Sequence, residues 1–341
     1  MSMNRYSRYG CVCVKIRGQV WIFEAYPFVC LSVCLPVCVS VSSSGLRGCR
    51  TWCCLCTVGQ LVHTLPEGPP VWGVTSLADE LYLLRSKGER DQVEVYDVVT
   101  YCLQRCLTVP NARTFTDLTS CEYYCCVYIG DDAEYVHRLD VQGTVTRWAV
   151  NDRPRGLSVN VAHNVLVTCL REGKIKEFGS RGYLLRELTL PGDVVNPWHA
   201  IQTRGGKILV CHGHPDDPVH RVCTMGDDGR HIVHSHGGYR GSNTGQYHVP
   251  VRLAVDDNEF VFVADVNNRR VTLLSPTLKY LHLAVSRDQL KWRPRRLHYN
   301  TRQRHLYVAD NDDSGDVTAG RVVVYSVDCL TYTNIVLRTA Y

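Results

Sequence analysis

From about residue 58 onward, short apolar runs and polar turns alternate along the chain at nearly regular spacing. Each unit of this pattern opens with a proline, which is soon followed by a run of alternating apolar residues. The six prolines are Pro70, Pro110, Pro154, Pro197, Pro250 and Pro294. Proline suits the start of a strand because its φ is fixed and it has no N–H group that needs a partner. The pattern therefore predicts internal repeats.

Inside each unit, two further apolar runs follow the first, and polar turns separate them. Residues 165–169 and 175–178 are an example, and residues 183–190 form a weaker fourth run. Four strands in about 40 to 45 residues, repeated around a ring, are typical of a β-propeller. No stretch keeps a helical period. The sequence thus predicts an all-β, six-bladed β-propeller with four-stranded antiparallel blades over residues 58–341, and almost no helix.

Residues 59–66 look like the outer strand of a blade whose other strands are missing. Propellers often close when a strand from one terminus completes the blade built by the other. We expect this N-terminal strand to close the ring. In the alternative, residues 333–339 supply the last strand.

Residues 1–57 do not share the repeat pattern. Residues 30–41 read CLSVCLPVCVSV, and a tandem TGTC tetranucleotide translates as Cys-Leu-Ser-Val, so this segment reads as translated simple-sequence DNA. The apolar run over residues 27–41 is shorter than the roughly 20 residues of a spanning helix. We expect residues 1–57 to be disordered or an artefact of the gene model. A membrane-associated segment and a folded cysteine module are the alternatives.

Charge and cysteine content separate the same two regions. Residues 1–65 hold six basic residues and one acidic residue, which accounts for the whole net charge of +5. The remainder is net neutral, so any site for an anionic partner must be a local patch. Cysteines in the repeats lie inside apolar runs without a disulfide spacing, which favours a reducing, cytoplasmic location. DNA and membranes are not expected partners.

The fifth unit carries the most specific motif, in the segment 249–276. It resembles the NHL repeat, in which a proline precedes an apolar strand ending in Asp, Ala-Asp ends the next strand, and Asn-x-Arg-Val opens the third. The matching residues are Pro250, Asp256, Ala264, Asp265, Asn268, Arg270 and Val271. The resemblance implies an NHL-type propeller similar to the C-terminal domains of tripartite-motif ubiquitin ligases, which bind protein or RNA. No RING or B-box pattern of Cys and His precedes it, so the chain would be a substrate-recognition piece of a ubiquitination pathway.

The repeat register suggests a ligand site. The second residue after each proline should lie at the mouth of the central channel. These six residues are Trp72, Ala112, Gly156, His199, Arg252 and Arg296. Of these, Trp72, His199, Arg252 and Arg296 would suit an acidic or aromatic group. Alternatively, their side chains pack or form hydrogen bonds within the channel.

A second candidate is a basic and aromatic patch. Its residues are Arg269, Arg270, Lys291, Trp292, Arg293 and Arg295. Basic side chains interleaved with an indole fit a single-stranded nucleic acid. Alternatively, the cations are simply solvated, and Arg270 stabilises a turn together with Asp265 and Asn268.

Seven histidines cluster between residues 212 and 248, but only His199 occupies the channel register, so no metal or other cofactor is expected. No motif of a nucleophile elbow, zinc protease or phosphate loop is present. We therefore expect a non-catalytic platform for protein–protein interaction. Binding of single-stranded RNA through the basic and aromatic face is the alternative, and a metal-dependent propeller lyase or hydrolase is a weaker one.

Overall fold

The computed structural model describes residues 11–16, 19–24, 54–86, 91–112, 114–312 and 319–331. The chain divides into two compact units, of which one is Cys56–Leu330 and the other combines Met1–Leu55 with Thr331–Tyr341. In the unit that contains the N-terminus, β1 (Cys11–Ile16) pairs antiparallel with β2 (Gln19–Glu24). The rest of residues 1–53 lies outside the described residues, as does 333–339. Disorder in residues 1–57 and the boundary at residue 58 therefore remain predictions.

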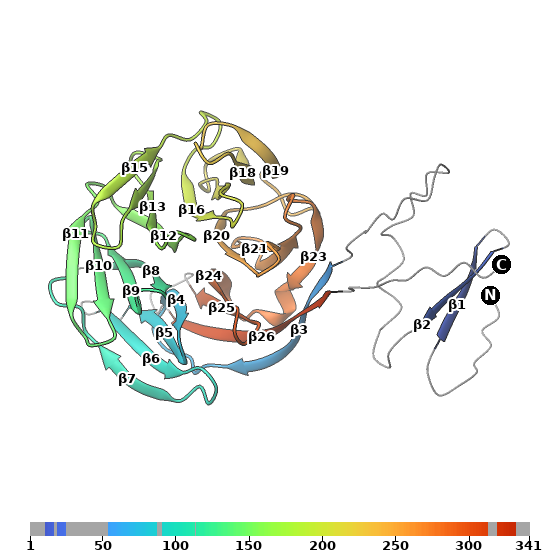
Figure 1. Ribbon diagram of the computed structural model, residues 1–341, viewed down its shortest axis with the longest axis horizontal. Helices are drawn as coiled ribbons and strands as arrows, with labels where there is room; N and C mark the ends of the chain where they lie inside the picture. Colours follow the sequence, from blue (N-terminus) through green and yellow to red (C-terminus); the bar gives the residue numbers. More distant parts are fainter. Residues whose placement is uncertain are drawn as a thin grey trace. The chain divides into compact units, whose positions relative to one another are not determined.

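Six four-stranded antiparallel sheets form the ring of the larger unit (Figure 1). Blade 1 consists of β4 (Val71–Leu77), β5 (Glu80–Arg85), β6 (Gln92–Asp97) and β7 (Leu103–Leu107). Blade 2 consists of β8 (Phe115–Cys121), β9 (Cys126–Asp131), β10 (Tyr135–Asp140) and β11 (Val145–Ala149). Blade 3 consists of β12 (Pro154–Val159), β13 (Val165–Cys169), β14 (Ile175–Phe178) and β15 (Leu184–Leu188).

The second half of the ring repeats this order. Blade 4 consists of β16 (Pro197–Gln202), β17 (Ile208–His212), β18 (Val219–Met225) and β19 (Ile232–Tyr239). Blade 5 consists of β20 (Pro250–Val255), β21 (Val261–Asp265), β22 (Arg270–Leu274) and β23 (Tyr280–Val285). Blade 6 consists of β24 (Arg293–Asn300), β25 (His305–Asp312), β26 (Ala319–Thr331) and β3 (Cys54–Thr64). The six-bladed β-propeller is confirmed.

Strand β3 is the outer strand of blade 6, next to β26, so the expected closure by the N-terminal strand is confirmed. Two backbone contacts continue this junction beyond the strand. The N–H of Leu65 donates to the carbonyl of Val322 at 2.9 Å, and Gly68 and Gly320 exchange hydrogen bonds. In the described ranges the only helical element is the 3-10 turn η1 (Arg287–Gln289). Within those ranges, no helix is long and apolar enough to cross a membrane.

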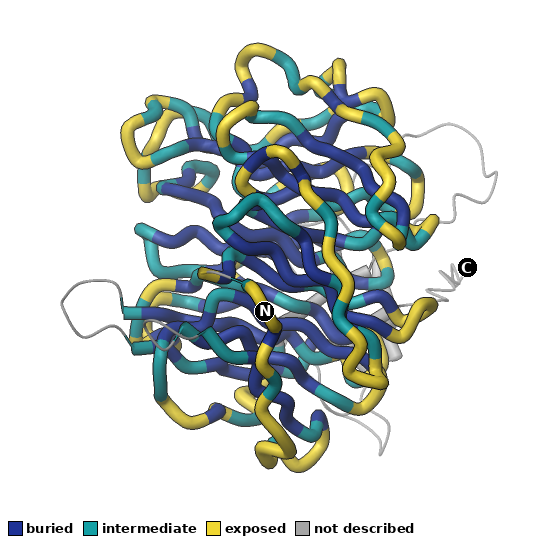
Figure 2. Tube along the Cα trace, turned by 90° about the vertical axis from the view of Figure 1, so that its left-hand side faces the viewer, coloured by how far each residue is buried: buried dark blue, intermediate teal, exposed yellow. Residues whose placement is uncertain are grey.

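The apolar core lies between neighbouring blades, where the middle strands of one sheet face those of the next. Strands β9, β13, β17 and β21 are buried along their whole length. Figure 2 shows the inner and middle strands mostly dark, and the loops and outermost strands lighter. Because each blade buries its apolar face only against its neighbours, the complete ring is needed to form this core.

Each inner strand begins with a β-bulge. The backbone N–H of the residue before the bulge is either absent, because this residue is proline, or bound by a side chain of another strand or loop. In blades 3 to 6 a proline occupies this position, so there is no N–H to satisfy. In blades 1 and 2 the equivalent residues are Val71 and Phe115. Their N–H groups donate to Asn311 Oδ1 at 3.0 Å and Asp91 Oδ2 at 2.5 Å. Pro70 and Pro110 were therefore the wrong anchors for these two blades.

Candidate functional site

The residue that follows the bulge occupies the same position in every inner strand and defines a ring near the axis. The six residues of this axial ring are Gly73, Asp117, Gly156, His199, Arg252 and Arg296. Trp72 and Ala112 were assigned to it wrongly, because their anchoring prolines are one and five residues out of register. Trp72 is the bulged residue of β4, and Ala112 lies before β8. The correction brings a carboxylate, Asp117, into the ring.

Asp117 is fully buried and holds both ring arginines. Its Oδ2 atom accepts from Arg252 Nη1 and, at 2.6 Å, from the N–H of Leu157, and its Oδ1 atom lies 3.4 Å from Arg296 Nε. Asp117 comes from blade 2 and Arg252 from blade 5, which stand opposite each other in a six-bladed ring. The ion pair between them therefore crosses the axis. Such a pair is stable only where the remaining donors and acceptors are also satisfied.

Backbone carbonyls accept hydrogen bonds from many of the remaining N–H groups of Arg252 and Arg296. Arg296 donates to the carbonyls of Trp72 at 2.6 Å and Thr116 at 2.8 Å, and its Cζ lies 5.7 Å from the centroid of the Trp72 ring. Arg252 Nη2 lies 3.5 Å from the carbonyl of Leu157. These contacts match the alternative in which the two arginines serve the channel. Their role in ligand binding remains a prediction.

His199 is uncharged, and its hydrogen bonds link three inner strands. Leu253 N–H donates to His199 Nδ1 at 3.4 Å, so Nε2 carries the proton and donates to the carbonyl of Leu157 at 3.1 Å. Burial, together with the positive charge of Arg252, holds the pKa of His199 well below its usual value. The four predicted channel residues are thus brought together, through Leu157, Asp117 and the carbonyl of Trp72.

A second polar cluster lies further along the inner strands. His298 Nε2 accepts from the N–H of Ser76 at 3.1 Å and from its hydroxyl at 2.7 Å, and Asn300 donates to the same hydroxyl at 3.0 Å. Burial lowers the pKa of His298 to about 3. His199 and His298 are therefore both uncharged near neutral pH while the ring stays folded.

The bulged residues themselves form an outer ring around the mouth, of which the sequence pointed only to Trp72 and Arg295. Its residues are Trp72, Thr116, Arg155, Trp198, Val251 and Arg295. All but Val251 are partly accessible. The Cζ atom of Arg155 lies 3.2 Å from the centroid of the Trp198 ring. In blades 3 to 6 the position directly after the proline was the available signal, because a bulge turns this residue away from its neighbours.

The predicted basic patch divides into residues with different environments. Arg270 is mostly buried, and it binds Asp265 at 2.8 Å and the carbonyl of Gln246 at 2.6 Å. Arg269 donates to the carbonyls of Leu290 and Lys291. Arg293 is exposed at the start of β24, and Arg295 is partly exposed within it.

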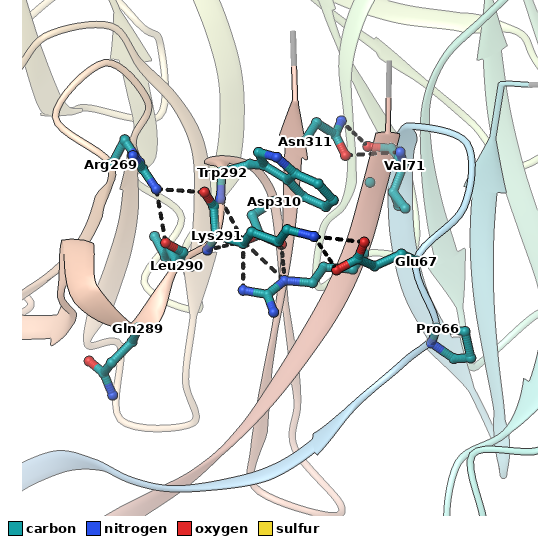
Figure 3. Close-up of polar contacts among 12 residues, drawn as sticks. Pro66, Glu67, Val71, Arg269, Gln289, Leu290, Lys291, Trp292, Asp310 and Asn311 are labelled. Atoms are coloured by element: carbon teal, nitrogen blue, oxygen red, sulfur yellow. Dashed lines mark hydrogen bonds and ion pairs between the residues drawn. The ribbon is translucent and has the colours of Figure 1, made fainter. Parts of the chain in front are cut away.

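Lys291 and Trp292 form a local pair at the start of blade 6. Figure 3 shows Lys291 extended toward Glu67, with Nζ 2.6 Å from Oε1. The same Nζ lies 4.3 Å from the centroid of the Trp292 ring. Asp310 accepts the N–H groups of both Lys291 and Trp292, and Arg321 binds this carboxylate. Arg269, Arg270 and Lys291 are therefore held by contacts within the protein, and binding of RNA by the patch remains a prediction.

Two histidines of the 212–248 cluster serve the fold. His220 Nδ1 accepts from the N–H of Val249 at 2.7 Å, and Nε2 donates to the carbonyl of Asp217. His212 accepts from Arg221 Nε at 3.1 Å, and burial lowers its pKa to about 4. Across the described ranges, no three His, Cys, Asp or Glu side chains converge as a metal site would require.

Solved structures with this architecture include two lyases and a β-propeller domain. A streptogramin B lyase is 12% identical, with a TM-score of 0.53, over 81% of this chain and 88% of its own. A virginiamycin B lyase from Staphylococcus aureus with quinupristin is 11% identical, with a TM-score of 0.52, over 81% and 89%. The Cps50 (Swd1) β-propeller domain of Myceliophteria thermophila is 11% identical, with a TM-score of 0.55, over 78% and 99%.

These likenesses extend over most of each chain and show the β-propeller fold. No protein-family model matches the sequence, and no curated protein matches it. One fold carries many functions, and the residues of the site decide which of them a given propeller performs.

Proposed function

We propose that the propeller is a non-catalytic binding platform and that a protein partner docks on the face that carries the channel mouth. The observation behind the proposal is the division between the two rings. The axial ring is buried except for Arg296, whose side chain is 11% exposed, and its charged groups are held by one another and by backbone carbonyls. The outer ring is partly accessible and offers arginine and tryptophan, which are enriched in protein interfaces.

A protein partner is favoured over single-stranded RNA because cationic side chains lie over the tryptophan rings of this face. A nucleic-acid surface needs aromatic faces on which bases stack. On this face each tryptophan has a cation over its ring: Arg296 over Trp72, Arg155 over Trp198 and Lys291 over Trp292. Two cations of the basic patch are also paired, because Lys291 binds Glu67 and Arg270 binds Asp265. A paired cation offers less to a phosphate than a free one.

We further propose that the blades are NHL-type and that the platform selects substrates for a separate ubiquitin ligase. The turn contacts of blade 5 support the first part. Asn268 Nδ2 donates to Asp265 Oδ2 at 2.7 Å, and Arg270 binds the same carboxylate. Blade 6 repeats the ion pair with Arg321 and Asp310, and these shared contacts suit the motif of the repeat.

The test is a selection of binding peptides from a displayed random library against the full chain. We expect peptides that bind with micromolar or tighter affinity and lose it when Trp198 on the mouth face is changed to alanine. Changing Tyr183 to alanine is the control, because this exposed tyrosine lies in the β14–β15 loop on the opposite face. No peptide above background, together with tight and steeply salt-dependent binding of oligouridylate, would instead establish the RNA alternative.

A further inference from the structure

Arg155 is the bulged residue of β12, and its Cζ atom lies over the indole ring of Trp198 on the neighbouring blade. The distance from Cζ to the ring centroid is 3.2 Å, which is close stacking. Stacking between Arg and Trp combines attraction of the cation to the ring with extensive van der Waals contact. It covers one face of the guanidinium and leaves its N–H edge for other partners.

That edge is almost without partners inside the protein. Among the described residues, its single hydrogen bond is a long one from Nη1 to the carbonyl of Pro197, at 3.5 Å, and no carboxylate pairs with it. Arg252 and Arg296, by contrast, share Asp117. Burial lowers the pKa of Arg155 to about 10, so the group is still charged at neutral pH. A half-buried cation with unused donors is a place where an anion gains binding energy.

The guanidinium is also held in position from behind. Trp198 Nε1 donates to the carbonyl of Gly213 at 2.9 Å, which fixes the indole plane. Gly213 adopts φ +117°, and a Cβ atom there would lie 2.8 Å from the carbonyl oxygen of Val219. Only glycine fits this turn without strain. The turn at Gly213 therefore fixes the position of the Trp198 indole, and this indole in turn fixes the position of the Arg155 guanidinium.

We propose that Arg155 receives a carboxylate side chain from an acidic segment of the protein partner, with the indole of Trp198 holding the guanidinium in place. This rests on the proposed function and names the chemistry of its partner. A planar guanidinium fork matches a carboxylate through two parallel hydrogen bonds. The local charge favours an anion as well: burial is the largest cause that lowers the pKa of Arg155, and the positive charges of Arg296 and Arg153 lower it further against the carboxylate of Asp217.

The test uses the full chain and a fluorescently labelled oligoglutamate peptide, with binding followed by anisotropy at about 50 mM and about 300 mM salt. The variants are Arg155→Gln, which removes the charge, and Arg155→Lys, which keeps the charge but loses the fork. Arg181→Gln is the matched control, because Arg181 is exposed in the β14–β15 loop on the opposite face. Thermal unfolding of each variant shows whether the ring remains intact.

We expect Arg155→Gln to weaken peptide binding about 10- to 100-fold, which is the usual size of a lost charge-assisted contact. Arg155→Lys should fall between Arg155→Gln and the parent, Arg181→Gln should match the parent, and the melting temperatures should stay equal. Equal peptide affinity of Arg155→Gln and Arg181→Gln would overturn the proposal. So would tighter binding of oligouridylate than of oligoglutamate through the same arginine.

The selection of displayed peptides distinguishes a failure of the Arg155 proposal from a failure of the proposed function. If selected peptides bind the mouth face but contain no excess of Asp and Glu, and Arg155→Gln leaves their affinity unchanged, the platform stands and the acidic partner is refuted. If no peptide binds at all, both proposals fail together.

Discussion

Most of the buried charge near the axis depends on one residue, Asp117. It is the only carboxylate in the axial ring, and it faces the guanidinium groups of Arg252 and Arg296 as well as the N–H of Leu157. Removing one member of a buried ion pair leaves the partner's charge without compensation in a medium that solvates it poorly. The stability of the ring should therefore respond more to this residue than to other aspartates.

Asp117→Asn preserves the shape of the side chain and removes its charge. We expect the free energy of unfolding to fall by about 3 kcal/mol or more, because two buried cations lose their counter-ion. Urea-induced unfolding measures the change, and Asp227→Asn, at an exposed turn, is the control. A loss below about 1 kcal/mol, as for a surface substitution, would mean that the carbonyls alone neutralise the arginines.

The buried histidines predict how stability depends on pH. Burial lowers the pKa values of His298 to about 3 and His212 to about 4, and holds that of His199 well below its usual range. The unfolded chain takes up protons below about pH 6.5 while the folded ring does not, so stability should fall as the pH falls. Between pH 6.5 and 5 the loss is about 2 kcal/mol per histidine.

Urea unfolding at a series of pH values tests this expectation with His298→Asn as the variant. An amide at this position can still accept from Ser76 but does not titrate, so the slope of stability against pH should decrease. An identical slope in the variant and the parent would show that His298 is not a source of the dependence.

Sequence reasoning found His199, Arg252 and Arg296 because a proline marks the start of each of their strands. It missed Asp117 because blade 2 replaces the proline with Phe115, whose N–H is satisfied by Asp91 from another blade. That compensation is a contact across space and leaves no local pattern in the sequence. Arg155 was missed for a different reason: its importance lies in the indole beneath it, which belongs to the next blade.

The inner strands show how closely neighbouring blades approach. At Gly156 in β12, an added Cβ atom would lie 2.6 Å from the carbonyl oxygen of Trp198 and 3.0 Å from the His199 ring. The other ring glycine, Gly73, is as crowded by Leu118 of β8. Small residues at these two places let the six strands converge on the axis, while the larger ring residues fill the space that remains.

Gly156→Ala should therefore destabilise the protein by about 1 to 3 kcal/mol, the usual cost of forcing extra volume into a packed interior. Gly192→Ala is the control, since a Cβ atom there meets nothing within 4 Å. Chemical denaturation of both variants decides the matter. Similar stabilities would mean that β12 and β16 can move apart at little cost.

At the level of the whole molecule, closure through β3 joins the two ends of the repeat array. This strand completes blade 6 beside β26, and without it the sheet would end in an unpaired edge. The fold could be predicted almost completely from the sequence, including this closure, because six similar units each leave an apolar face that only a neighbour can cover. The exact register of the inner strands could not be predicted, because it depends on β-bulges and on contacts between blades.

Removing residues 1–65 should lower the melting temperature and promote association through the exposed edge, while removing residues 1–53 retains β3. Differential scanning calorimetry and size-exclusion chromatography compare the two truncations. If they melt alike and both remain monomeric, β3 contributes little to closure.

The ion pair between Asp117 and Arg252 has a consequence for anything that approaches the mouth. Because it bridges opposite blades, a pair of buried charges lies across the axis of the larger unit. A group that entered along this axis would meet the ion pair. We therefore expect a partner to insert a single short residue at the mouth and to be selected by the loops around it, instead of passing a chain through the ring.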